Sequence, residues 1–132
     1  MTPPVTNALS TRVHAPFAEV VSDVRAALAA QGFGVLTEID VRATMAAKLG
    51  EQMEDYLILG ACNPPLAHRA LSVDRGIGVM LPCNVVVRAD GGSVLVEAVD
   101  PLGMVAATGQ AGLAAVAEEA EVKLAAALAT LG

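Results

Sequence analysis

The sequence is poor in aromatic residues and has no concentrated positive charge. It contains no tryptophan, and its aromatic side chains are Phe17, Phe33 and Tyr56. Its eight lysines and arginines are spread singly along the chain, and fourteen aspartates and glutamates outnumber them, which gives a net charge of -6. Nucleic-acid-binding surfaces need clustered cations, and single-strand binders add stacking aromatics. The composition therefore argues against nucleic acid as a partner.

Long apolar runs and a secretion signal are also missing. Hydrophobic residues make up 55% of the chain. Charges or glycines nevertheless interrupt each stretch that approaches the roughly 20 apolar residues of a membrane-spanning helix. The N-terminus, Met-Thr-Pro-Pro-Val-Thr, lacks the basic start and apolar run of a secretory signal. These absences predict a cytoplasmic protein of bacterial type with no membrane partner.

The length predicts one domain. The 132 residues are close to the usual size of a single domain, and no change in composition marks a linker. We expect a loose, proline-bearing segment over residues 1–8, followed by a single α+β domain over residues 9–132.

Apolar periodicity predicts four or five strands and three or four helices. We expect strands over 9–14, 33–39, 56–61, 77–89 and 94–99, helices from 16, over 41–49, from 64 and from about 112, and a short turn of helix just after 100. In the second strand, Phe33, Val35, Thr37 and Ile39 are expected on one face, and in the fourth strand Pro82 marks an edge or a bulge. Asp90-Gly91-Gly92 is typical of a hairpin turn.

The hairpin favours antiparallel pairing, and strands and helices do not alternate strictly. The pattern therefore predicts an α+β fold with a mostly antiparallel 4–5-stranded sheet and helices packed on one face. Asp40 and Asp100 both occupy positions expected for helix N-caps, so a structural role is predicted for them rather than catalysis.

Two segments place a cysteine before an asparagine where the backbone is irregular. Cys62 and Asn63 stand between a predicted strand and a predicted helix, and Cys83 and Asn84 follow Pro82. The N-terminus of a helix stabilises a thiolate, which makes Cys62 a candidate reactive or ligand-binding group. These four residues form the predicted ligand-binding set. The competing interpretation is that both thiols only pack, as buried cysteines often do.

A soft metal is one ligand that this set could hold. With no secretion signal, two cysteines suggest free thiols, a redox pair or a shared metal rather than a structural disulfide. His68 follows Cys62 by six residues, so Cys62, Cys83 and His68 form a candidate metal set. Thiolates favour Cu(I) or Zn(II) over Mg(II). Because neither cysteine lies in a CxxC pair, an ordinary surface histidine is the competing interpretation.

Several segments resemble one known family. They are Gly32-Phe33-Gly34-Val35-Leu36-Thr37-Glu38-Ile39-Asp40, Lys48-Leu49-Gly50, Tyr56-Leu57-Ile58-Leu59-Gly60-Ala61-Cys62-Asn63-Pro64, Leu81-Pro82-Cys83-Asn84-Val85-Val86-Val87 and Val99-Asp100-Pro101. Together they resemble, from about residue 11 to residue 131, the family catalogued as "domain of unknown function 302". The resemblance implies a TATA-box-binding-protein-like fold with a curved antiparallel sheet, often in a dimer, of bacterial or archaeal origin. It does not imply DNA binding, because fold alone does not carry function.

Three functional hypotheses follow. The first is a small binding or sensing module, with Cys62, Asn63, Cys83 and Asn84 around a soft metal, a haem-like cofactor or a reactive sulfur species. The second is a thiol or sulfur redox enzyme, with Cys62 as the nucleophile and Cys83 as the resolving thiol. The third is a structural homodimerisation domain in which the thiols only pack. Whether the protein is an enzyme, and which cofactor it uses, stay open at this level.

Overall fold

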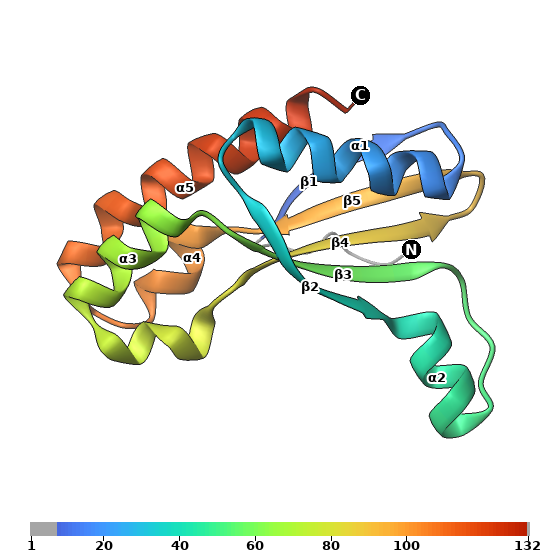
Figure 1. Ribbon diagram of the computed structural model, residues 1–132, viewed down its shortest axis with the longest axis horizontal. Coiled ribbons are helices and arrows are strands. Elements are labelled where there is room, and N and C mark those ends of the chain that lie inside the picture. The colour runs from blue at the N-terminus through green and yellow to red at the C-terminus, as the bar shows by residue number, and fades with distance from the viewer. Residues whose placement is uncertain (1–7, 132) are drawn as a thin grey trace.

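The computed structural model describes residues 8–131 and has an antiparallel sheet of five strands in the order β1-β5-β4-β3-β2 (Figure 1). The strands are β1 (Ala8–Val13), β2 (Gly34–Asp40), β3 (Tyr56–Cys62), β4 (Cys83–Asp90) and β5 (Ser93–Val99). The predicted α+β class and antiparallel sheet are confirmed. Of the loose segment predicted over residues 1–8, residues 1–7 lie outside the described part, and Ala8 is the first residue of β1.

Two long helices, α1 (Phe17–Ala30) and α5 (Ala111–Ala129), pack on one face of the sheet. The helix predicted from residue 16 is confirmed as α1, and it buries Val20, Val24 and Leu28, which lie four residues apart on one helix face. Gly32 follows the helix with φ 85°, a left-handed conformation that glycine adopts without steric cost.

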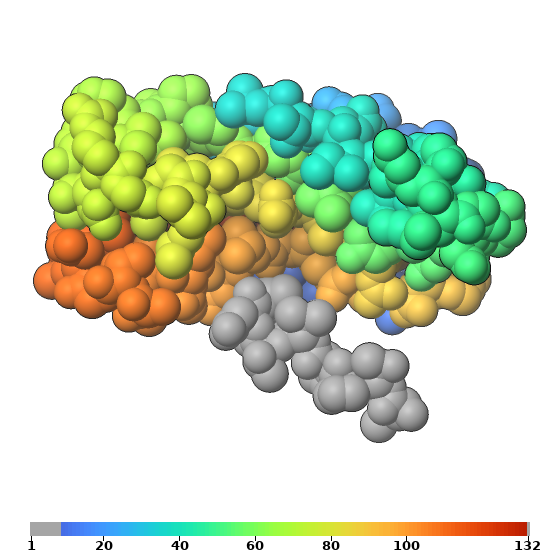
Figure 2. Space-filling model, turned by 90° about the horizontal axis from the view of Figure 1, so that it is seen from below, coloured from blue at the N-terminus to red at the C-terminus, as the bar shows by residue number. Residues whose placement is uncertain are grey.

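Three shorter elements gather at one end of the sheet, around the N-terminal half of α5 (Figures 1 and 2). They are α3 (Pro64–Val73), the 3-10 helix η1 (Arg75–Met80) and α4 (Pro101–Ala106). The remaining helix, α2 (Val41–Leu49), lies at the opposite end and buries none of its residues. Within the described part of the chain, no helix is both long and apolar enough to span a membrane.

The buried side chains form two clusters, and α5 contributes to both. The sheet core lies between the sheet, α1 and the C-terminal half of α5, and it contains Val20, Val24, Leu28, Phe33, Leu59, Ala61, Val85, Val87, Val94, Val96, Ala98, Leu124, Ala127 and Leu128. The end core lies between α3, η1, α4 and the N-terminal half of α5, and it contains Leu66, Ala70, Ile77, Val105, Leu113, Val116, Ala117 and Ala120.

The predicted caps are confirmed as structural. The Asp40 carboxylate accepts a hydrogen bond of 2.9 Å from the Ala43 backbone N–H at the start of α2. The Asp100 carboxylate accepts one of 3.1 Å from the Leu102 N–H at the start of α4. Both carboxylates satisfy backbone donors that the helix itself leaves unpaired.

The prediction of one strand over residues 77–89 is wrong. Residues 75–80 form the 3-10 helix η1, and β4 begins only at Cys83. The Asp74 side chain accepts from the Gly76 N–H at 2.9 Å, which starts a turn where apolar alternation predicts a strand. The segment then reaches Pro82 through a cis Leu81–Pro82 bond. Because proline has no N–H to donate, strand pairing starts only after it.

The prediction that Phe33, Val35, Thr37 and Ile39 share one face is also wrong. The register between β2 and β3 shifts between Val35 and Thr37, which leaves Leu36 as the extra residue of a β-bulge. Val35 therefore pairs with Ala61 on the helix-covered face, whereas Thr37 pairs with Gly60 on the open face. One inserted residue moves every later side chain of β2 to the other side.

Candidate binding site

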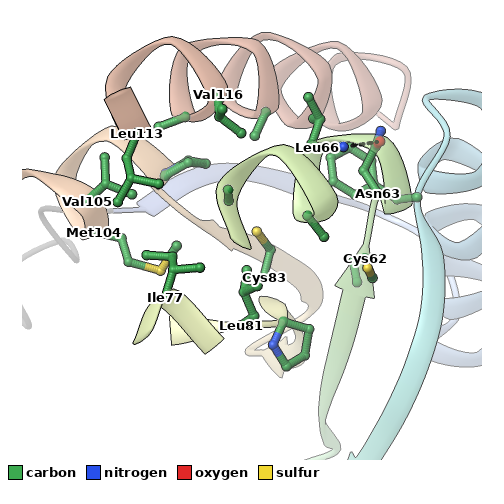
Figure 3. Close-up of a pocket in the computed structure, with 18 of the residues that line it drawn as sticks. Cys62, Asn63, Leu66, Ile77, Leu81, Cys83, Met104, Val105, Leu113 and Val116 are labelled. Carbon is green, nitrogen blue, oxygen red and sulfur yellow. Dashed lines mark hydrogen bonds between the residues drawn. The ribbon is translucent and has the colours of Figure 1, made fainter. Parts of the chain in front are cut away.

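A cavity of about 270 Å³ lies between the ends of β3 and β4 and the helices of the end core (Figure 3). Its walls are almost entirely carbon, and Leu66, Ile77, Val105, Leu113 and Val116 supply much of them. No charged side chain is among the lining residues. The arrangement is that of a site for an apolar guest, because unpaired charges would be costly to bury there.

Small side chains create this space. Ala67 and Ala70 of α3 and Ala117 and Ala120 of α5 all line the cavity, as does Ala61 of β3. Alanine at several converging positions leaves volume that leucine or valine would otherwise fill. The cavity therefore results from alanines on the apolar faces of two helices, α3 and α5.

The Cys83 thiol points into this cavity from the start of β4 (Figure 3). Cys83 pairs with Ala61 on the helix-covered face of the sheet and is 8% exposed. Burial raises the pKa of the Cys83 thiol above its ordinary value, and the neighbouring Cys62 raises it further. Cys83 is therefore a neutral thiol at physiological pH. In this form its side chain is small, polarisable and nearly apolar, like the rest of the cavity wall.

Cys62 also lines the cavity, but it belongs to the other face of β3. It follows Ala61 directly, and successive strand residues point to opposite faces. Since Ala61 is the partner of Cys83, the two cysteine side chains leave the sheet in opposite directions. A disulfide between them would require a local rearrangement of the backbone, because bridged cysteines must have converging Cβ positions.

Asn63 uses its amide to hold the backbone together. Its Nδ2 donates to the Gln31 carbonyl at 3.2 Å, and its Oδ1 accepts from the Leu66 N–H at 3.5 Å. A Cβ on Gly32 would lie only 3.1 Å from Asn63 Nδ2, so the turn after α1 approaches this amide closely. Asn63 lines the cavity, and its polar atoms join the end of α1 to the start of α3.

The other two predicted site residues lie elsewhere. His68 is exposed on α3, and Asn84 is exposed on the open face of the sheet opposite Gly60. Neither lines the cavity. Residues 8–131 contain no group of three or more His, Cys, Asp or Glu side chains that could hold a metal. The structure thus brings together Cys62, Asn63 and Cys83, but it does not assemble the predicted set of Cys62, Cys83 and His68.

Gly60 allows the strands beside the cavity to approach one another. A Cβ at Gly60 would collide with Thr37 Oγ1 and would lie 2.7 Å from Pro82 Cγ. Thr37 comes from β2, and Pro82 lines the cavity just before β4. The missing side chain therefore sets the position of one wall of the site.

Sequence reasoning missed most of the lining. Met104 and Leu113 line the cavity without belonging to any motif quoted above, and Leu36 lies in a motif that gave no sign of a role at a cavity. Ala117 and Ala120 lie on the buried face of α5, and their small size at these positions is the signal in the sequence that a hollow could form.

An antiparallel sheet with helices on one face and an apolar cavity at its end defines the class of this protein. Residues 9–131 match the family described as "Domain of unknown function DUF302", and the chain belongs to that family. The chain is similar to the crystal structure of an uncharacterized conserved DUF302 protein from Bacillus stearothermophilus. That similarity has a TM-score of 0.91 and 26% sequence identity, over 97% of this chain and 100% of the other. Among curated proteins, none matches this chain.

Proposed function

We propose that this protein is a binding module for a small, neutral, predominantly apolar molecule held in the cavity of the end core. The observation that carries the proposal is the cavity itself, which combines about 270 Å³ of space with a lining that has no charged side chain. Burial of apolar ligand surface supplies the driving force, at roughly 25 cal/mol per Å².

The volume sets the size of the ligand. Drug-sized ligands occupy pockets of about 300–1,000 Å³, and an apolar cavity of about 150 Å³ accepts benzene. A cavity of about 270 Å³ therefore suits a guest somewhat larger than benzene and disfavours a haem-like macrocycle.

The polar groups near the cavity favour a neutral guest. The Asn63 amide is engaged by backbone groups, and the Cys83 thiol is held neutral by burial. Cys83 and Met104 offer polarisable sulfur atoms that make favourable contacts with aromatic rings. These surroundings support apolar binding over the alternatives of thiolate–metal ligation and dithiol redox cycling.

The test is a fluorescence titration with naphthalene and with its charged analogue 1-naphthoate. The chain has no tryptophan, so the emission of the probe is free of tryptophan fluorescence. We expect saturable one-to-one binding of naphthalene and binding of 1-naphthoate that is weaker by more than about tenfold, because a carboxylate would be buried without a partner.

Two variants of α5 locate the binding. Ala117→Leu places three more carbons in the cavity and should weaken naphthalene binding strongly, whereas Ala125→Leu, on the exposed side of the same helix, should bind as the wild type does. If Ala117→Leu does not fold, Ala70→Leu narrows the cavity from α3. Absence of saturable naphthalene binding by the wild type, or equal binding by the two cavity variants, would overturn the proposal.

A further inference from the structure

The β-bulge of β2 places an exposed leucine at the cavity. Leu36 is the extra residue between Val35, which faces the sheet core, and Thr37, which lies against Gly60. It lines the cavity although its own exposure is 68%. A residue that is both exposed and part of the lining marks where the cavity meets solvent.

The rest of this region fits an opening. Cys62 and Pro82 also line the cavity and are only half-buried, whereas the opposite wall contains Leu113 at 1% exposure and Ile77 at 3%. A Cβ at Gly34, which pairs with Cys62, would meet no atom within 4 Å, so this side of the site is uncrowded. The cavity is therefore deep against α5 and open beside β2.

A β-bulge bends its strand and re-aims the side chains around the extra residue. Bulges occur often beside functional sites for this reason. In a regular edge strand, side chains alternate between the two faces of the sheet. At the bulge, the large apolar side chain of Leu36 is instead left in water at the opening of the cavity, where covering it with an apolar surface is favourable.

We propose that Leu36 is the gate residue of the cavity. Its side chain folds over a bound neutral apolar ligand and slows the ligand's escape. This inference rests on the proposed function. The apolar side chain at the opening is covered when the ligand enters, so the contact forms only in the bound state and acts chiefly on the dissociation rate.

The test compares Leu36→Ala with Leu49→Ala. Leu49 is a matched control, because it is 67% exposed on α2 and does not line the cavity. Stopped-flow naphthalene fluorescence gives the association and dissociation rates for each variant, and urea unfolding gives the stability of each. Since both leucines are exposed, neither change should alter the unfolding midpoint appreciably.

We expect naphthalene to leave Leu36→Ala about three to ten times faster than it leaves the wild type, with an equal loss of affinity. Leu49→Ala should match the wild type. If the wild type binds naphthalene and Leu36→Ala releases it at the wild-type rate, the gate is overturned while the binding function stands. If the wild type does not bind naphthalene, both proposals are overturned together.

Discussion

The sheet core and the end core are built by the same helix, but they are packed differently. No member of the sheet core is more than 4% exposed, whereas members of the end core reach 8% at Val116 and 9% at Val105. The C-terminal half of α5 presents Leu124 and Leu128 to a filled interior, and its N-terminal half presents Ala117 and Ala120 to the cavity. The comparison separates a part of the molecule that supplies stability from a part that supplies space.

The largest expected difference between the two cores comes from shortening a leucine of α5. Leu124→Ala in the sheet core should lower the free energy of unfolding by about 4 kcal/mol, because it empties a filled site. Leu113→Ala should cost about 2 kcal/mol, because that side chain already borders a cavity and has fewer contacts to lose. Urea denaturation measures both. An equal or larger cost at Leu113 would mean that the end core is packed as tightly as the sheet core.

Enlarging an alanine tests the same difference in the opposite direction. Ala127→Leu should destabilise the protein by about 2 kcal/mol through overpacking, because Ala127 is 1% exposed in the sheet core. Ala117→Leu, at 3% exposure, should change stability by less than about 0.5 kcal/mol or increase it, because the added carbons enter the cavity. Thermal and urea unfolding of the two variants provide the comparison. Equal destabilisation by both would contradict the account of a hollow end core.

A smaller effect is expected at Gly60, in the strand beside the cavity. Gly60→Ala should cost about 1–2 kcal/mol, because the new Cβ displaces Thr37 and Pro82. Gly34→Ala is its control in the neighbouring strand, where a Cβ meets nothing within 4 Å, and it should be neutral or stabilising by up to about 1 kcal/mol. Equilibrium unfolding measures both variants. A tolerated Gly60→Ala would show that the wall can move freely.

The smallest expected effect is a dependence of stability on alkaline pH. Because burial raises the pKa of Cys83, the folded protein holds the thiol proton more tightly than the unfolded chain does. The resulting contribution to the free energy of unfolding is fully present below the thiol pKa of the unfolded chain, about 8.5. It is lost as pH rises through the higher thiol pKa of the folded protein. Unfolding midpoints from pH 7 upward should therefore fall more steeply in the wild type than in Cys83→Ala. Cys62→Ala should keep most of the wild-type slope, since burial is the larger cause of the shift.

Local signals in the sequence were sufficient for most of the fold. The caps at Asp40 and Asp100 and the Asp90-Gly91-Gly92 turn each depend on neighbouring residues, and these predictions are confirmed. The strand predicted over 77–89 failed because a single side-chain cap at Asp74 selects a 3-10 helix over a strand for the same apolar residues.

The candidate site was less accessible to sequence reasoning. The sequence grouped Cys62, Asn63, Cys83 and Asn84 as one candidate set, and the structure places the first three at one cavity and Asn84 outside it. Whether two thiols on neighbouring strands share a face depends on the register, which pairs Cys83 with Ala61 rather than with Cys62. The position of Leu36 depends on a bulge, and the cavity depends on tertiary packing, so neither has a local signature. The homodimer and the compartment expected from the sequence stay predictions.

The central claim is that the end core, and not the sheet core, receives a neutral apolar molecule. Methyl-resolved NMR during a naphthalene titration tests this most directly, because methyl groups report on both cores at once. The account predicts saturable shifts at Leu66, Ile77 and Leu113, while Leu28, Val96 and Leu124 stay unchanged. Shifts confined to the sheet core or to the exposed surface, or no shifts in a solution saturated with naphthalene, would contradict it.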